Sequence, residues 1–138
     1  MPELPFKILG VEHVGIAVED LNSISDIFGD LLGLELRSRE KIDDQQVITD
    51  IYDTGSGKLE FLKATDKNSP ISRFIDKKGK GVHHIALKVD NLQAALDYLK
   101  GQGAQLIDTL PRIGAEGFKI AFLHPKSTGG VLIELCEK

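Results

Sequence analysis

The stretch His13-Val-Gly-Ile-Ala-Val-Glu-Asp-Leu21 decides the fold, because the chain repeats it as His84-Ile-Ala-Leu-Lys-Val-Asp-Asn-Leu92. A second echo closes each copy, first as Leu59-Glu60-Phe61 and then as Ile133-Glu134-Leu135. One repeat of this length indicates a duplicated supersecondary unit rather than a solenoid, whose periods are shorter and more numerous. Each copy carries one histidine and one glutamate. The repeat therefore selects four potential metal ligands, which are His13, Glu60, His84 and Glu134.

Both copies show the same order of patterns. Strand patterns at 11–18 and 82–89 are each followed by apolar residues at helical spacing, over 24–32 and 92–99. The period then drops to two over three segments per copy, which are 34–39, 46–52 and 58–63, then 105–110, 119–123 and 130–136. We therefore predict one α+β domain, 1–138, of two tandem βαβββ modules at 8–63 and 81–137. The polar linker 64–80 is predicted to carry one short helix at 71–76.

The predicted helix ends rest on local signals. Asn22 and Ser23 are candidate N-caps of the first helix, and Gly33 stands where a C-terminal glycine belongs. Asp90 and Asn91 stand before the second helix.

Strand alternation predicts where the repeated polar side chains point. In the first strand of each copy, the β-branched and leucine side chains share one face, and the histidine shares the other with glycine or alanine. The apolar face must pack under the helix. Glu60 and Glu134 are likewise out of phase with their apolar neighbours. All four residues are therefore expected on the face of the sheet that the helices do not cover.

The composition limits the class of protein. With 138 residues, 41% hydrophobic and 28% charged, the chain fits a single globular domain. Its net charge of −4 argues against a nucleic-acid partner, which needs a clustered positive surface. We expect no membrane span and no secretion signal. The single Cys136 excludes an internal disulfide and favours a cytoplasmic location.

Two imidazoles and two carboxylates on one sheet face would form a His2Glu2 site for a divalent ion of cobalt, nickel, zinc, manganese or iron. One such residue alone would more often be structural, but four that recur in register favour a metal site. His83 points to the helix side and is expected to be structural. On spacing alone, Asp43 and Asp44 indicate a solvated turn.

The quoted segments, with Phe122-Leu-His-Pro-Lys-Ser-Thr-Gly-Gly-Val-Leu-Ile-Glu-Leu135, resemble the vicinal oxygen chelate superfamily and within it the methylmalonyl-CoA epimerases. The resemblance implies a glyoxalase fold, with a curved, cup-shaped mixed sheet and helices on its outer face. It also implies that His13, Glu60, His84 and Glu134 bind one divalent metal ion. The implied activity is interconversion of (R)- and (S)-methylmalonyl-CoA through a metal-chelated thioester enolate.

The resemblance further implies that one carboxylate lies on each side of the substrate α-carbon. One is Glu134, and the other is a loop glutamate that aligns with Asp44. Asp44 and Glu116 both depart from the epimerase pattern. The implied partners are an acyl-CoA thioester and a second copy of the chain in a homodimer. A lyase of the glyoxalase I type and a metal-free small-molecule-binding protein remain the alternatives.

Overall fold

The computed structural model describes residues 3–138, whose contacts divide into two compact units. The His13 unit comprises residues 13–83, and the His84 unit combines residues 84–138 with the N-terminal segment up to Glu12. The boundaries fall inside two strands, β1 (Ile8–Ala17) and β5 (Gly81–Val89). The predicted module boundaries therefore stay a prediction.

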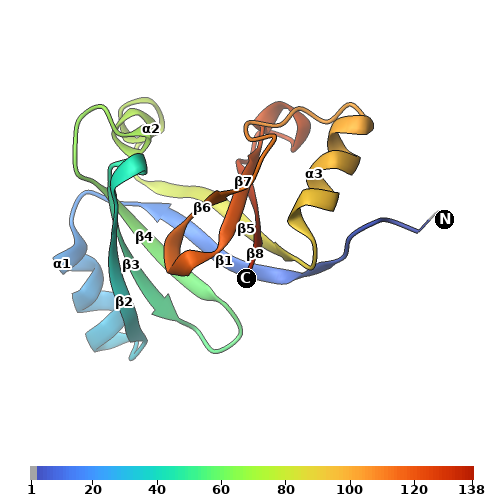
Figure 1. Ribbon diagram of the computed structural model, residues 1–138. Coiled ribbons are helices and arrows are strands. Elements are labelled where there is room, and N and C mark those ends of the chain that lie inside the picture. Colours follow the sequence, from blue (N-terminus) through green and yellow to red (C-terminus); the bar gives the residue numbers. More distant parts are fainter. Residues whose placement is uncertain (1–2) are drawn as a thin grey trace. The chain divides into compact units, whose positions relative to one another are not determined.

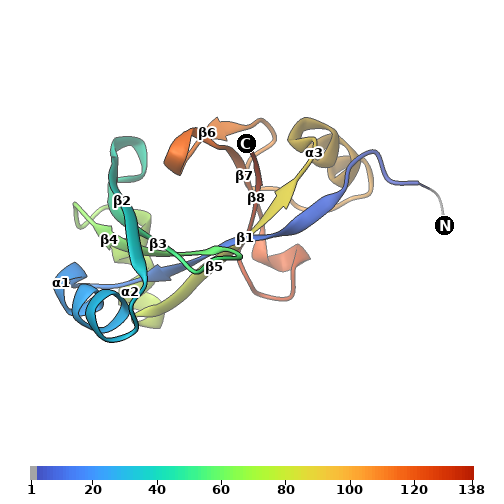
Figure 2. The ribbon, with the colours of Figure 1, turned by 90° about the horizontal axis from the view of Figure 1, so that it is seen from below.

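The sheet of the His13 unit has the strand order β2-β3-β4-β1 (Figure 1). Its strands after β1 are β2 (Glu35–Ile42), β3 (Val47–Asp53) and β4 (Lys58–Ala64). β2, β3 and β4 run antiparallel, whereas β1 pairs with β4 in parallel. The β2–β3 hairpin carries the 3-10 turn η2 (Asp43–Gln45) at its end, as Figures 1 and 2 show.

The first predicted helix differs in type and start. A short α1 (Leu21–Ile24) continues directly into a π-helix, η1 (Ser25–Leu31). The N-cap is Asp20, whose side chain accepts a hydrogen bond from the backbone N–H of Asn22, so the predicted caps were wrong. Gly33 adopts a φ of +73° at the end, as predicted. The apolar stripe survives the change of helix type, because Phe28 stacks on Phe61 of β4 with ring centroids 4.8 Å apart.

The linker helix α2 (Pro70–Lys78) lies on the other face of the same sheet. Ser69 caps it by accepting a hydrogen bond from the backbone N–H of Ile71 at 3.1 Å. Its apolar side packs against Ala17, Val47 and Leu62. The predicted helix at 71–76 is confirmed and extends further at both ends.

An ion pair between the half-exposed Arg39 of β2 and the buried Asp50 of β3 joins the two strands. Arg39 donates two hydrogen bonds, of 2.6 and 2.8 Å, to the carboxylate of Asp50 opposite it. Asp50 has no exposed surface, whereas the Arg39 side chain is 53% exposed. The hydrogen bonds that Arg39 donates to Asp50, together with the negative charge of that carboxylate, raise the pKa of Arg39. This pair explains how the sheet tolerates a buried carboxylate.

The His84 unit repeats the arrangement with the strand order β5-β8-β7-β6. The strands are β6 (Arg112–Ile113), β7 (Lys119–Leu123) and β8 (Ile133–Glu137), and short 3-10 turns lie at η3 (Ala115–Gly117) and η4 (Pro125–Ser127). α3 (Leu92–Gly101) is capped by Asn91, as predicted. Its buried side, with Leu92 and Leu96, packs against Val89 and Leu135. The element order thus confirms two βαβββ repeats.

The predicted strand at 105–110 is wrong. Only Leu106 forms an isolated bridge, to Leu123, and the edge strand β6 comes later and has two residues. The Asp108 carboxylate explains the break, because it accepts the hydrogen bond from the backbone N–H of Phe122 at 2.8 Å. Pro111 also has no N–H to offer a ladder. Within residues 3–138, no helix is long and apolar enough to cross a membrane.

Candidate active site

In the His13 unit, α1 and η1 cover one face of the sheet, and the other face carries the repeated polar residues beside the part that α2 covers. Val18, Tyr52 and Phe61 form the core under α1. His13, Glu60 and Thr49 lie on the opposite side, which is named here the His13 face. The predicted strand alternation is therefore confirmed. The expectation that no helix covers this face is wrong, because α2 packs on Ala17, Val47 and Leu62 of the same face.

His13 and Glu60 form a buried pair on that face. His13 Nδ1 lies 3.0 Å from Glu60 Oε2, and the two residues are 5% and 4% exposed. Gly15, the register partner of Glu60 in β1, has no side chain to fill the space beside the carboxylate. The local sequence thus places no side chain at the position next to Glu60 in β1.

The His84 unit contains the same pair. His84 Nε2 lies 3.6 Å from Glu134 Oε1, and both residues are 4% exposed. The small residue Ala86 is the register partner of Glu134, in the position that Gly15 holds beside Glu60. The face shared by His84, Ala86 and Glu134 is named here the His84 face. Duplication has therefore preserved the donor types and the space beside them.

The donor separations in both pairs suit ligands of one divalent ion. Two donors bound about 2.1 Å from an ion lie about 3.0 Å apart at a right angle and about 3.4 Å apart at the tetrahedral angle. Imidazole nitrogen with carboxylate oxygen is a donor set for divalent transition metals. A bound cation would also offset the cost of burying the Glu60 and Glu134 carboxylates. Each pair therefore fits half of a metal site.

Asp44 lies in η2 and is exposed to solvent, unlike the buried side chains of the His13 face. Another carboxylate does belong to that face. Glu40 of β2 is half-buried, is the register partner of Thr49, and accepts a hydrogen bond from the Ser38 hydroxyl at 3.4 Å. The alternation of β2 with β3 was the sequence signal that places Glu40 there.

Thr49 is a second residue that the sequence reasoning missed. It is 1% exposed, and its Oγ1 has no hydrogen-bond partner among residues 3–138. A buried hydroxyl without a partner costs free energy, so such groups occur where a ligand or water completes them. Its place on the His13 face makes it a candidate for contact with a ligand.

The His84 face carries an aromatic and cationic extension of the histidine–glutamate pair. The Phe122 ring meets the His84 ring edge-to-face, with centroids 5.7 Å apart, and Phe122 is the register partner of Glu134. Arg112 lies over the Phe122 ring, with Cζ 5.5 Å from the centroid. Sequence patterns gave no reason to link Arg112 to His84.

One protein-family model matches most of the chain. Residues 12–122 match the model of the glyoxalase/bleomycin resistance protein/dioxygenase superfamily. The chain belongs to this superfamily. Members of the glyoxalase superfamily typically bind a divalent metal ion, and each histidine–glutamate pair contains donor types that suit such an ion.

Curated relatives of the chain within the glyoxalase superfamily include named epimerases. The mouse mitochondrial methylmalonyl-CoA epimerase is 36% identical over 94% of this chain and 74% of its own. The ethylmalonyl-CoA/methylmalonyl-CoA epimerase of Cereibacter sphaeroides is 36% identical over 91% of this chain and 95% of its own. An uncharacterised protein of Bacillus subtilis is 42% identical over 92% of this chain and 91% of its own.

Solved structures confirm the predicted glyoxalase fold. The methylmalonyl-CoA epimerase of Mycobacterium tuberculosis is 36% identical, with a TM-score of 0.89 over 94% of this chain and 88% of its own. A methylmalonyl-CoA epimerase in complex with methylmalonyl-CoA and NH4+ is 30% identical, with a TM-score of 0.89 over 96% of both chains. The predicted resemblance to the epimerases of the glyoxalase superfamily is thereby confirmed.

His83, next to His84, has a different environment. Its ring meets the Phe74 ring of α2 edge-to-face, with centroids 4.9 Å apart. Burial lowers the pKa of His83 to about 4, and the nearby Lys78 ammonium contributes. His83 is therefore a neutral packing residue at ordinary pH.

His124 and Cys136 also have side chains that can bind metals, and both have local contacts in the structure. His124 Nδ1 accepts a hydrogen bond from the backbone N–H of Lys126, so the ring caps η4. Cys136 is buried with Ala86, Ile120 and Phe122, as a small apolar residue would be.

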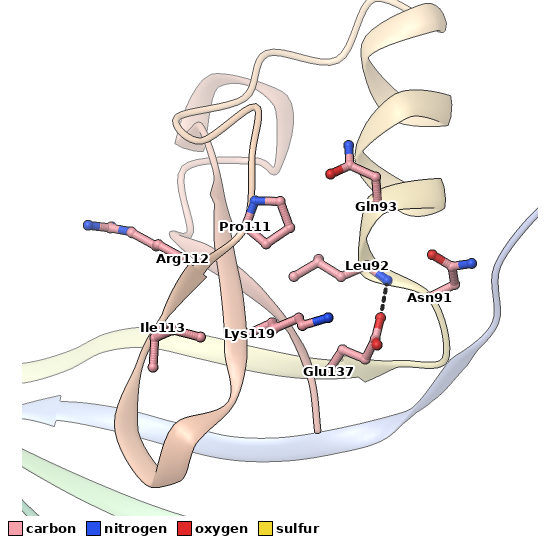
Figure 3. A pocket seen from close by; sticks show the side chains of 8 residues that line it. All are labelled: Asn91, Leu92, Gln93, Pro111, Arg112, Ile113, Lys119 and Glu137. Carbon is pink, nitrogen blue, oxygen red and sulfur yellow. Dashed lines mark hydrogen bonds between the residues drawn. The ribbon is translucent and has the colours of Figure 1, made fainter.

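A cavity of about 390 Å³ lies on the α3 side of the His84 unit (Figure 3). Leu92, Lys119 and Glu137 line it, and Glu137 accepts a hydrogen bond from the backbone N–H of Leu92. Lys119 and Glu137 are register partners, and each is out of phase with the residues of the His84 face on its strand. The cavity therefore lies across the sheet from Glu134.

Proposed function

We propose that this chain is a metal-dependent epimerase that interconverts (R)- and (S)-methylmalonyl-CoA. The observation that carries the proposal is the buried histidine–glutamate pair repeated in both units. The named activity of the relatives and the acyl-CoA ligand of a neighbour 30% identical to this chain support the choice of reaction and substrate.

We infer that His13, Glu60, His84 and Glu134 together hold one divalent ion, each pair supplying half of the ligands. A bound ion would act as a Lewis acid that stabilises the negative charge developing on the thioester oxygen. The identity of the metal depends on availability as much as on these donors.

The chain's own residues would move the proton. Inversion at the α-carbon requires removal of a proton from one face and its return on the other. We assign the first role to the Glu134 carboxylate, which is buried beside His84. We assign the second to Asp44, whose side chain is exposed in η2 at the end of the β2–β3 hairpin. Glu40 is the competing candidate because it already lies on the His13 face.

Proton NMR of methylmalonyl-CoA in deuterated water tests the proposal. Metal-loaded protein should exchange the α-proton for deuterium and give both epimers. Retention of the α-proton, even with enzyme at the same concentration as the substrate, would overturn the assignment. Turnover of a hemithioacetal instead would favour a lyase of the glyoxalase I type. Retained small-molecule binding without a stoichiometric metal would favour a metal-free binding protein.

We also propose that the protein works as a cytoplasmic homodimer. Cys136 is buried and forms no disulfide among residues 3–138, which is consistent with a reducing compartment. Sedimentation of the metal-loaded protein, at the concentration used to measure its activity, tests the oligomeric state. A monomer under these conditions would contradict the dimer.

A further inference from the structure

The Arg112 guanidinium is held in place without using its hydrogen-bond donors. Its Cζ lies 5.5 Å from the centre of the Phe122 ring, and its Nε lies 3.5 Å from Asp108 Oδ1. Nε is buried and has no hydrogen-bond partner among residues 3–138. A guanidinium has five N–H donors in a fixed fork, which suits a planar carboxylate.

Asp108 fixes the position of this cation. One carboxylate oxygen accepts the hydrogen bond from the backbone N–H of Phe122 at 2.8 Å, and the other faces Arg112. The ring, the arginine and the aspartate therefore form one packed group. The Asp108 contact is too long to be a strong hydrogen bond, so it orients the guanidinium and leaves its donors available.

The side chain of Arg112 points to the His84 face. Arg112 pairs with Ile120, which shares that face with Phe122 and Cys136. Arg112 lines the edge of the α3-side cavity with Lys119 and Glu137, and Figure 3 shows its side chain extending away from α3. Phe122 joins the cation to His84, with ring centroids 5.7 Å apart. These two distances place Arg112 Cζ within about 11 Å of the His84 ring centroid, with the guanidinium donors available to a ligand.

We propose that Arg112 binds the free carboxylate of a 2-carboxyacyl-CoA and so makes the site select charged acyl groups over uncharged ones. This inference rests on the proposed function, because it takes the acyl-CoA as the ligand. A phosphate of the coenzyme A portion has similar chemistry and is the competing source of the anion. Charge-assisted, bidentate contacts of this kind are the strong hydrogen bonds of protein–ligand recognition.

Calorimetric binding to metal-loaded protein tests the proposal with methylmalonyl-CoA, propionyl-CoA and methylmalonyl-pantetheine. Propionyl-CoA lacks the acyl carboxylate, and methylmalonyl-pantetheine lacks the coenzyme A phosphates. Arg112→Gln should weaken both methylmalonyl ligands by about 10- to 100-fold, as expected for loss of a charge-assisted contact. Its affinity for propionyl-CoA should change less than about twofold, since that ligand has no acyl carboxylate for Arg112 to bind. Arg112→Lys should give an intermediate loss, because it keeps the charge and loses the fork.

Two controls separate binding from packing. Arg112→Met keeps an apolar stem over Phe122 and should match Arg112→Gln in ligand preference, with unchanged metal content and melting temperature. Lys119→Gln removes a cation from the opposite face of the same hairpin and should leave all three affinities unchanged.

The outcomes are distinguishable. Equal weakening of both coenzyme A ligands, with methylmalonyl-pantetheine unaffected, would assign Arg112 to a phosphate and overturn the proposal. An unchanged preference in Arg112→Gln, in a protein that still exchanges the α-proton, would overturn this inference and leave the proposed function standing. Wild-type protein that neither binds nor exchanges methylmalonyl-CoA would overturn both.

Discussion

Glu134 Oε1 lies 3.6 Å from His84 Nε2, in the second copy of a pair whose first copy, in the other unit, brings Glu60 within 3.0 Å of His13. Both glutamates are buried and of the same chemical type. The proposed mechanism nevertheless assigns proton transfer to Glu134 alone, which makes the two carboxylates a matched pair for experiment.

Glu134→Gln should lower the rate of epimerisation about 100- to 10,000-fold, because the amide keeps a metal-binding oxygen and cannot accept the proton. Glu60→Gln should have a much smaller effect on the rate at saturating metal. Turnover by NMR, with metal content measured on the same samples, checks this. Equal losses in the two variants would show that both glutamates serve only as ligands.

Asp44→Ala should block inversion while one epimer continues to exchange its α-proton with solvent, because Glu134 still serves one face of the α-carbon. Deuterium incorporation from each pure epimer measures this separately from inversion. Asp43→Ala is the matched control, since it removes an exposed carboxylate from the same turn. Loss of inversion in Glu40→Gln, with full inversion in Asp44→Ala, would transfer the role to Glu40.

Removal of the metal with a chelator should lower the melting temperature, since each buried pair loses the cation that offsets its carboxylate. A ligand at 100 times its dissociation constant stabilises a fold by about 2.7 kcal/mol, which corresponds to about 10 °C for a chain of this size. Calorimetry with and without added Co²⁺ or Zn²⁺ checks the shift. The same melting temperature for both forms would contradict the metal site.

Arg39→Met should lower the free energy of unfolding by about 3 kcal/mol, because it leaves the Asp50 carboxylate buried without a partner. The matched control is Arg37→Met in the same strand, whose partner Asp53 is 40% exposed at 3.3 Å. That loss should stay below about 1 kcal/mol. Urea denaturation measures both, and equal losses would mean that the burial of Asp50 has no energetic consequence.

The His83 ring should titrate by NMR with a pKa of about 4. Since the folded-state pKa lies below the unfolded value of about 6.5, the folded protein holds fewer protons between these values, and stability falls as pH drops from 6.5 to 4. Phe74→Ala should raise the pKa by exposing the ring, and Lys78→Gln should raise it less. A His83 pKa above 6 in the wild type would contradict the burial described here.

The sequence by itself determined the repeat, the faces that α1 and α3 cover, and the four histidine and glutamate residues on the opposite faces. These are consequences of local geometry, because strand alternation fixes which side a residue occupies once the apolar side is known. The sequence did not show that α2 packs on part of the His13 face. The same reasoning failed at 105–110, where one side-chain carboxylate, Asp108, takes a backbone donor that a ladder would need. It also could not separate an α-helix from the π-helix η1, because a single apolar stripe fits both.

Only the tertiary structure decided what the chemistry-bearing residues contact. The ring of Phe122 links Arg112 to His84, and the β2–β3 register brings Glu40 opposite Thr49. Both relationships join residues from different strands, and the spacing of these residues along the sequence does not predict that they are in contact. They depend on sheet register and side-chain packing, which form only when distant segments of the chain fold against one another.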